Sequence, residues 1–488
     1  MSSAITVNIR GNARICVPYA LDQITPFVLL EQEDWFEDEI HFVRRYLRPG
    51  MNAVDVGANF GVYTTAMARA VGQHGRVWAF EPTPETADYL QATLDENQAG
   101  QVSLGRFAIS DREGTLQFRL SRQPELNAVV APGELGDGIV SVPAQTLDRL
   151  AAQHGWSDVA FVKLDVEGHE QQAVDGAAEF LRAASPLLMF EVKGKFKAEL
   201  GVLEPLRAMG YFFFRLVPGL CALIPFDPDK PFDGYLLNLF ACKEDRAAML
   251  VEQGLLALPT GTVEAPTSSA WHGYVQNAPY AHELSRHWPS GAQPQSAREF
   301  RRYLDGLALY ATSRDSNLNA AARYAALMQA ARCVTEAQAA EETLPRQLTA
   351  CRLAWELGHR SPAVQMLSKA CELIDPQLSA LTREPFLIPS PRYERKAIHA
   401  PPQTWVLQAV AEQFQKLRTF SSIYEGTQGL PLLEHLVQAP YCSPEMERRR
   451  QLIRIYAGMQ SGPEPHVLLS TASEENLNPD YWNGQTGV

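Results

Sequence analysis

Four acidic residues each follow a short apolar run that predicts a buried β-strand. They are Asp55, Glu81, Asp165 and Glu191. In an α/β sheet the carboxyl ends of the strands open onto the cleft where ligands bind, so we expect these side chains to face one site. Carboxylates accept hydrogen bonds from ammonium and hydroxyl groups, and a suitably tuned acid or imidazole can take a proton from a reacting hydroxyl. The positions therefore predict a small-ligand site with acid–base chemistry.

The first of these acids opens a glycine-rich turn. Residues 51–61 read MNAVDVGANFG, and the apolar residues of 62–71 follow with helical spacing, which predicts a strand, a turn and a helix. Glycines let a ligand approach the backbone, and a helix N-terminus offers unpaired N–H groups. The turn therefore supplies the first ligand-binding candidates: Asp55, Gly57, Ala58, Asn59 and Gly61.

Asp55 decides which ligand suits this turn. A dinucleotide site has the pattern G-x-G-x-x-G without an acid against the phosphates, and a carboxylate here would repel a diphosphate. A carboxylate instead suits the ammonium of S-adenosylmethionine, whose nucleoside end carries a free ribose diol. Glu81, after the strand 76–80, is placed to accept hydrogen bonds from both ribose hydroxyls. Ser110, after the strand 102–109, is expected to pass close to the adenine.

A second charged motif is AFVKLDVEGHE, residues 160–170. Lys163, Asp165 and Glu167 alternate along a strand that should be central, so they point the same way and either form an internal ion cluster or face the cleft. Asp165 at the strand tip is the best catalytic position in the sequence. His169 begins the next helix, where it is either structural or a general base with a suitable near-neutral pKa. The catalytic candidates are Asp165, Glu167, His169 and Glu191.

The order of the remaining elements predicts a doubly wound α/β fold. Two strands in succession, 211–217 and 235–243, indicate an antiparallel pair at the sheet edge, as in the methyltransferase version of this fold. Residues 115–142 add an excursion of short strands, and such insertions often shape a substrate pocket.

Residues 5–17 predict a hairpin, and residues 33–47 predict one amphipathic helix ahead of the sheet. Trp35 and Phe36 on that helix either cap the ligand pocket or pack in the core. We favour core packing, because aromatic residues at helical spacing usually serve it.

Five motifs occur in an order that resembles one protein family. They are DVGANFGVYT, AFEPTPE, AISDREG, TLDRL and VKLDVEGHE, and together they are similar to the FkbM family of S-adenosylmethionine-dependent methyltransferases. The resemblance covers residues 50–195 and the strands that follow as far as Lys243. It implies a class I methyltransferase fold and O-methylation of a hydroxyl on a sugar or natural product. It also implies cofactor contacts from Asp55, Gly57, Asn59, Gly61 and Glu81, and an acidic strand-end motif of Asp165, Glu167, His169 and Glu170.

Methyl transfer of this kind is an in-line displacement. The acceptor oxygen approaches the sulfonium methyl along the S–C axis, so positioning supplies much of the rate, and Asp165 or His169 takes the proton. A divalent ion held by Asp165, Glu167 or Glu191 could grip an acceptor diol, since carboxylate oxygens suit magnesium. The sequence has no dedicated metal-ligand spacing, so the predicted cofactor is S-adenosylmethionine and a metal is not favoured.

The chain divides into five predicted segments. They are an N-terminal hairpin and helix (1–50), a methyltransferase domain (51–243), a linker (244–297), an α-helical tetratricopeptide-like domain (298–460) and a tail (461–488). Residues 357–376 resemble the second half of a tetratricopeptide repeat with one extra residue, and no other clean copy is visible. A helical domain of this kind either binds a protein partner or a second copy of the chain, or is purely structural. The predicted fold class is α/β, a class I (Rossmann-like) methyltransferase sheet with an antiparallel edge strand, followed by an all-α helical-hairpin domain.

The amino-acid composition limits which binding partners and which cellular location we predict. The 488 residues carry a formal net charge of −13, which disfavours a nucleic-acid surface because phosphate binding depends on lysine and arginine. The seven cysteines form no C-x-x-C pair, which indicates reduced thiols. No apolar run reaches the length of a membrane span and no secretory signal is visible, so we predict a cytoplasmic protein.

The predicted function is O-methylation of a small-molecule, glycan or natural-product acceptor. One alternative is N-methylation of a peptide or protein side chain presented by the helical domain. Another is a non-catalytic binding or scaffold protein, which the joint presence of Asp55, Glu81 and Asp165 disfavours. A nicotinamide oxidoreductase is disfavoured by Asp55 and Asn59.

Overall fold

The structure is a computed structural model. It describes residues 4–122, 124, 127–130, 138–192, 201–258, 270–288, 297–399 and 401–459. The predicted tail, 461–488, lies outside the described residues. The chain forms two compact units, the first mainly from residues 4–216 and 225–253 and the second mainly from residues 217–224 and 254–453.

A mixed sheet organises the first unit. Its strands are β3 (Asn52–Val56), β4 (Arg76–Phe80), β5 (Val102–Gly105), β10 (Val159–Leu164), β11 (Leu187–Glu191), β12 (Phe212–Val217), β13 (Ala222–Pro225) and β14 (Asn238–Cys242). Over the described residues the strand order is β13-β12-β14-β11-β10-β3-β4-β5. Neighbours from β5 to β11 are parallel, whereas β14 is antiparallel to both β11 and β12. The predicted class I sheet with an antiparallel pair toward one edge is confirmed, and β13 is a short strand that the sequence did not predict.

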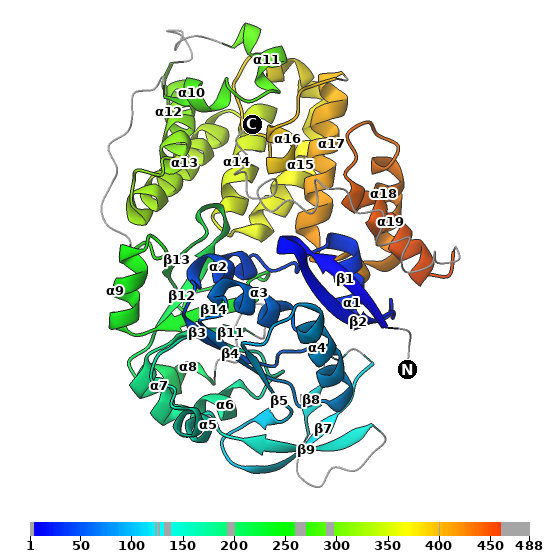
Figure 1. The fold of residues 1–488 in the computed structure, drawn as a ribbon. Coiled ribbons are helices and arrows are strands. Elements are labelled where there is room, and N and C mark those ends of the chain that lie inside the picture. Colours follow the sequence, from blue (N-terminus) through cyan, green and yellow to red (C-terminus); the bar gives the residue numbers. More distant parts are fainter. Residues whose placement is uncertain are drawn as a thin grey trace. The chain divides into compact units, whose positions relative to one another are not determined.

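Helices cover both faces of this sheet (Figure 1). One face carries α2 (Glu39–Tyr46), α3 (Val62–Val71) and α4 (Pro84–Glu96), and the other carries α5 (Leu147–His154), α6 (Glu170–Asp175), α7 (Ala178–Ala184) and α8 (Leu203–Ala208). Val54 and Val162 share a core with residues of α5 to α8. Because side chains alternate along a strand, their neighbours Asp55 and Lys163 point to the α2 and α3 face. The helix α9 (Glu244–Glu252) follows β14.

The N-terminal hairpin is confirmed, but the single helix predicted over residues 33–47 is wrong. β1 (Ala4–Ile9) pairs with β2 (Ala13–Pro18), and then α1 (Ile24–Gln32) precedes α2. Glu33 ends α1 in the left-handed conformation, with φ +57°. The next residue, Asp34, is buried and binds Arg44 at 2.7 Å and Arg10 at 3.4 Å. Arg10 lies outside the segment for which the helix was predicted, so helical periodicity within that segment could not show the break.

The predicted strand 102–109 is also divided. β5 belongs to the main sheet, whereas β6 (Ala108–Ile109) joins β7 (Gly114–Arg119), β8 (Ala128–Val129) and β9 (Ile139–Gln145) in a second sheet, with order β6-β9-β7-β8. At the division, the space beside the Gly105 Cα is filled by the rings of Phe80 and Phe107. The predicted excursion of short strands is thus a separate small sheet.

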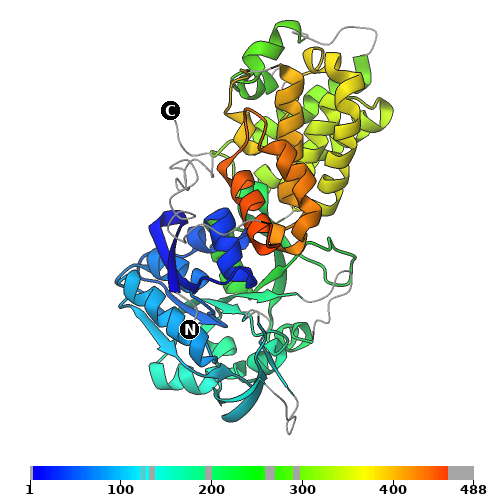
Figure 2. The same cartoon turned by 90° about the vertical axis from the view of Figure 1, so that its right-hand side faces the viewer.

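The second unit is helical. Its helices are α10 (Trp271–Val275), α11 (Ala281–Leu284), α12 (Ala297–Ser313), α13 (Ala320–Ala340), α14 (Leu344–Glu356), α15 (Arg360–Gln377), α16 (Pro391–Glu394), α17 (Pro402–Arg418), α18 (Leu430–Leu436) and α19 (Pro444–Tyr456). The long helices α12 to α15 and α17 lie side by side (Figures 1 and 2). Their core includes Trp405, whose ring stacks on Tyr280 with centroids 5.2 Å apart. Tyr280 lies in the predicted linker, so part of that segment is built into the helical core.

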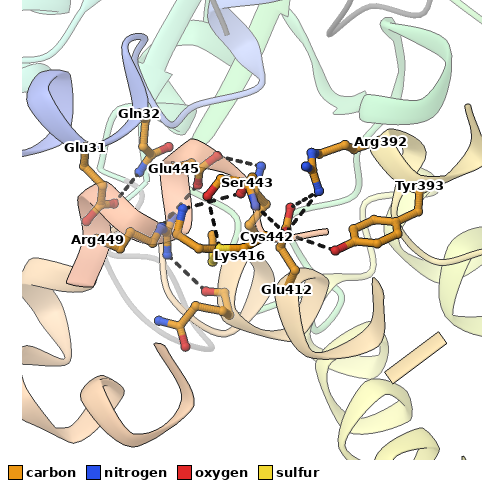
Figure 3. A network of polar contacts seen from close by, with 12 residues as sticks. Glu31, Gln32, Arg392, Tyr393, Glu412, Lys416, Cys442, Ser443, Glu445 and Arg449 are labelled. Atoms are coloured by element: carbon orange, nitrogen blue, oxygen red, sulfur yellow. Dashed lines mark hydrogen bonds and ion pairs between the residues drawn. The ribbon is translucent and has the colours of Figure 1, made fainter. Parts of the chain in front are cut away.

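Buried ion pairs tie the later helices of this unit together (Figure 3). Glu412 on α17 accepts hydrogen bonds from Arg392 and from the Tyr393 hydroxyl, each at 3.3 Å. Glu445 on α19 lies 2.6 Å from Lys416 and 3.2 Å from Arg449. Burial alone would raise the pKa of Glu445, but these two cations lower it to about 2.

All seven cysteines are free thiols. Among the helices that the structure describes, none is both long and apolar enough to cross a membrane.

Candidate active site

Gly57 and Gly61 shape the turn between β3 and α3. Their φ angles are +79° and +92°, a region that side chains disfavour. A Cβ on Gly57 would lie 1.8 Å from the carbonyl oxygen of Asp165, and one on Gly61 would lie 2.6 Å from the Leu90 side chain. At these two positions other parts of the protein therefore fill the space that a side chain would occupy. These contacts pack the turn against the segment after β10 and against α4.

Some backbone N–H groups of the turn donate hydrogen bonds to other parts of the protein. The N–H groups of Gly57 and Ala58 both donate to the carbonyl of Phe80 at 3.0 Å, which fixes the turn to the end of β4. Asn59 adopts φ +48°, and its N–H donates to Glu81 at 3.1 Å. Its side-chain oxygen Oδ1 is buried and has no hydrogen-bond partner among the described residues. The turn thus leaves one unsatisfied acceptor beside Glu81.

Glu81 is held in place by both carboxylate oxygens. Oε2 accepts from the Asn59 N–H, and Oε1 accepts from the N–H of Thr83 at 2.9 Å and from its hydroxyl. Burial raises the pKa of Glu81, and these hydrogen bonds act in the opposite direction. A carboxylate offers about four acceptor positions and these contacts use three of them, so Glu81 keeps one for a ligand hydroxyl, and Asn59 Oδ1 offers a second acceptor.

Asp55 is completely buried at the end of β3. Its Oδ2 accepts a hydrogen bond from the Thr64 hydroxyl on α3 at 2.6 Å, while Oδ1 has no partner among the described residues. Burial raises the pKa of Asp55, and the ammonium of Lys163 on β10 acts against this rise. A buried acceptor without a donor is costly unless a ligand supplies one.

Lys163 connects Asp55 with Asp165. The Lys163 ammonium is buried and lies 2.8 Å from Asp165 Oδ2 and 5.1 Å from the centre of the Tyr63 ring. Burial alone would lower the pKa of Lys163, but Asp165, Asp55 and Glu37 outweigh it and raise the pKa above its ordinary value. Of the two arrangements that the sequence left open, Lys163 and Asp165 form an internal ion pair, and Asp165 also keeps 36% of its side chain exposed.

Glu37 and Tyr63 are members of this cluster that the sequence analysis missed. The Tyr63 hydroxyl donates to Glu37 Oε2 at 2.6 Å, and the Trp35 side chain also donates to Glu37. Burial raises the pKa of Glu37. Trp35 and Phe36 are half-buried, with ring centres 4.5 Å apart. Glu37 lies between α1 and α2, where a continuous helix was predicted, and the glycine-rich motif does not point to it.

The segment after β10 is braced from within. Glu170 accepts hydrogen bonds from the N–H groups of Val166 at 3.3 Å and Gly168 at 3.1 Å, so its role is to shape the loop. Glu167 adopts φ +53°, which is uncommon for a residue with a side chain.

Three of the predicted catalytic residues come together at the strand ends. Carboxylate oxygens of Asp165, Glu167 and Glu191 lie within 4.8 Å of one another, and all three side chains are half-buried. They come from the ends of the neighbouring strands β10 and β11, as the pattern of acids at strand tips predicts. Carboxylate oxygens so close together suit a cation or a ligand rich in hydroxyl groups.

His169 and Ser110 contact each other. Ser110 is completely buried, and its hydroxyl lies 2.9 Å from His169 Nε2 and 3.0 Å from Asp111 Oδ1. The sequence predicts the Ser110 hydroxyl near the adenine of the cofactor. In the structure this hydroxyl contacts His169 and Asp111 within the protein. Burial lowers the pKa of His169, whereas Asp111 and Glu170 act to raise it. A lowered pKa keeps the imidazole neutral near pH 7, the form that can take up a proton.

A comparison with known protein families matches the part of the chain that contains these strands. A family model described as the methyltransferase FkbM domain matches residues 55–213. These residues are therefore similar to methyltransferase FkbM domains. The match begins at Asp55 and includes the turn, Glu81 and the carboxylates at positions 165, 167 and 191, whereas Glu37 precedes it.

Two curated proteins are similar to part of this chain. Hexuronic acid methyltransferase AglP of Haloferax volcanii is 28% identical over 134 residues, which are 27% of this chain and 52% of that protein. Protein-L-isoaspartate O-methyltransferase of Triticum aestivum is 29% identical over 82 residues, 17% of this chain and 32% of that protein. The chain thus spans about half the length of the first curated relative and about a third of the second. The crystal structure of methyltransferase FkbM from Methylobacillus flagellatus KT shares 18% identity, covering 42% of this chain and 50% of that one, with a TM-score of 0.28.

Proposed function

We propose that the FkbM domain binds S-adenosylmethionine and transfers its methyl group to a hydroxyl of a sugar, glycan or natural product. The observation that carries this proposal is the set of buried acceptors at the ends of β3 and β4. Asp55 Oδ1 and Asn59 Oδ1 have no partners among the described residues, and Glu81, fixed by the Asn59 N–H, keeps one further acceptor position. A ligand with an ammonium and a ribose diol supplies the donors that these oxygens lack.

Different residues would bind different parts of the cofactor. Asp55 would receive the ammonium, and Glu81 the ribose hydroxyls, with Asn59 beside it. When bound, S-adenosylmethionine supplies an electrophilic methyl group on a sulfonium, which an acceptor oxygen displaces in line. The Lys163 ammonium acts against the rise that burial gives the pKa of Asp55, which favours a carboxylate facing the ammonium of the ligand.

Asp165, Glu167 and Glu191 would orient the acceptor. Their oxygens accept hydrogen bonds from neighbouring hydroxyl groups, which suits a polyol such as a sugar. The name of AglP, a hexuronic acid methyltransferase, supports an acceptor of this class. As the acceptor oxygen forms its bond to the methyl carbon and the S–C bond breaks, the hydroxyl proton passes to Asp165 or His169.

Calorimetric titration of the full chain with S-adenosylmethionine, S-adenosylhomocysteine and NAD tests the cofactor. We expect both sulfur nucleosides to bind and NAD not to bind. Asp55→Asn and Glu81→Gln should each weaken binding by about tenfold or more, because each removes hydrogen bonds to a charged group. Glu85→Gln is the matched control, since Glu85 is an exposed acid near Glu81 in sequence. Tight NAD binding, or equal affinities for all three variants, would contradict the proposal.

A panel of labelled acceptors tests the second half of the proposal. We expect a methyl ether on a sugar, with uronic acids and neutral sugars compared directly. A methylated amine as the main product would instead favour the N-methyltransferase alternative. A cytoplasmic location, and a protein partner or homodimer for segment 298–460, stay predictions from the sequence.

A further inference from the structure

The strand-end carboxylates have a polar neighbour that neither the sequence motifs nor the family comparison includes. Asn238 begins β14 and stands directly opposite Glu191 of β11 in the antiparallel register. Residues opposite one another in such a pair carry their side chains on the same face, with Cβ atoms about 4.5–5.5 Å apart. Asn238 therefore points to the side of the sheet on which Glu191 lies.

The Asn238 side chain is buried without a partner. Only 5% of the residue is exposed, and its amide nitrogen Nδ2 has no hydrogen-bond partner among the described residues. A buried amide group without a partner is costly, and the assignment of amide N and O is interchangeable by rotation about the last side-chain bond. After that rotation the buried atom is a carbonyl oxygen, on the face of the sheet that carries the Glu191 side chain.

We propose that Asp165, Glu167, Glu191 and Asn238 form a binding site for one divalent cation. Three carboxylates and one amide oxygen are hard ligands, the set that Mg²⁺, Mn²⁺ and Ca²⁺ prefer. The three carboxylate oxygens already lie within 4.8 Å of one another, so small side-chain movements bring them around one ion. A cation bound among these three carboxylates would lower the repulsion between them.

The cation gives the acceptor site a chemical preference. Its open positions would bind two neighbouring acceptor oxygens, such as those of a diol or a hydroxy acid, and its charge would lower the pKa of the bound hydroxyl. This role in the reaction rests on the proposed function, whereas binding of the ion does not. The acceptor class becomes a polyol or hydroxy acid that can chelate a metal.

Direct metal titration tests the site in the absence of substrates. The full chain is freed of metal with a chelator and titrated with MnCl2, while free Mn²⁺ is followed by electron paramagnetic resonance. We expect one Mn²⁺ per chain, displaced by Mg²⁺ or Ca²⁺. Glu191→Gln and Asn238→Leu should each weaken Mn²⁺ binding by at least about tenfold. Glu179→Gln removes an exposed acid of the same unit and is the control.

The outcomes separate this inference from the proposed function. Absence of stoichiometric Mn²⁺, or equal affinity in the Glu191 and Glu179 variants, would overturn the metal site. If Glu191→Gln does not fold, as judged by circular dichroism, Glu167→Gln replaces it. S-adenosylmethionine binding is measured on the same samples: cofactor binding without Mn²⁺ binding refutes the metal site alone, and Mn²⁺ binding without cofactor binding refutes the proposed function alone.

Discussion

Lys163→Met tests the ion cluster beneath the candidate site. The change removes a buried ammonium that lies 2.8 Å from Asp165 and compensates the fully buried Asp55, while keeping a side chain of similar length. At 2.8 Å two unit charges attract by about 6 kcal/mol at an effective dielectric constant of 20, and desolvation of the ammonium offsets part of this. Removing one partner of a buried pair costs about 3–5 kcal/mol. Because Asp165 is 36% exposed and water can replace part of the lost attraction, we expect a loss of about 3 kcal/mol at pH 8.

The loss should depend on pH. Burial already raises the pKa of Asp55 in the folded chain, and without Lys163, which acts against that rise, it goes higher. A folded state that binds more protons than the unfolded state loses stability as pH rises. As pH falls, protonation of the Asp55 carboxyl removes part of this cost, so we expect a smaller loss at pH 5 than at pH 8.

Hydrogen–deuterium exchange across a urea series measures this loss locally, in peptides that contain β3 and β10. Lys163→Arg keeps the charge and is the control, with a smaller and pH-independent effect. A loss below about 1 kcal/mol at pH 8, or an equal loss at pH 5 and pH 8, would refute the idea that Lys163 compensates buried carboxylates.

Three further predictions follow from the same geometry. Gly57→Ala places a Cβ 1.8 Å from the Asp165 carbonyl oxygen and should lower both the melting temperature and the affinity for S-adenosylmethionine. Gly100→Ala, where no atom lies within 4 Å of the added Cβ, is the control and should change neither. Normal affinity in Gly57→Ala would mean that the turn is not fixed by this contact. Glu445→Gln should destabilise the helical unit by about 2–4 kcal/mol at pH 7. Since the folded pKa of Glu445 is lowered to about 2, its stabilisation is present above the unfolded value and fades as pH falls toward 2. The difference in calorimetric melting between wild type and variant should therefore be smaller at pH 3 than at pH 7 and should disappear only near pH 2. His169→Ala should lower kcat by about 10²-fold if His169 is the base, with the acidic limb of the wild-type pH–rate profile below pH 6.5 because burial lowers its pKa; an unchanged limb in His169→Ala would assign the base to Asp165.

Local patterns were sufficient for the core of the fold. Strand β3, the glycine turn and α3 are adjacent in sequence, so apolar spacing and two glycines predict all three, and Asp55 takes its place at a strand end. Strand β4 and Glu81 follow by the same argument. The carboxylates at positions 165, 167 and 191 were predicted separately, and the parallel order of β10 and β11 brings them together.

Contacts between distant segments account for what the sequence did not show. Glu37 accepts a hydrogen bond from Tyr63, which is 26 residues away in sequence and lies on α3. Likewise Asn238 is one of many polar residues until the antiparallel register sets it opposite Glu191. The periodicity of apolar residues shows which face of a helix or strand is buried. It does not show which other helix or strand packs against that face.

The order of the strands separates the site into two parts that can be changed independently. The cofactor candidates lie on β3 and β4, the acceptor candidates Glu191 and Asn238 lie on β11 and β14, and β10 runs between the two pairs. Asp165, whose carbonyl rests against Gly57, is the residue common to both. A directed-evolution library at positions 167, 191 and 238 should therefore yield new acceptor preferences while the methyl donor stays the same.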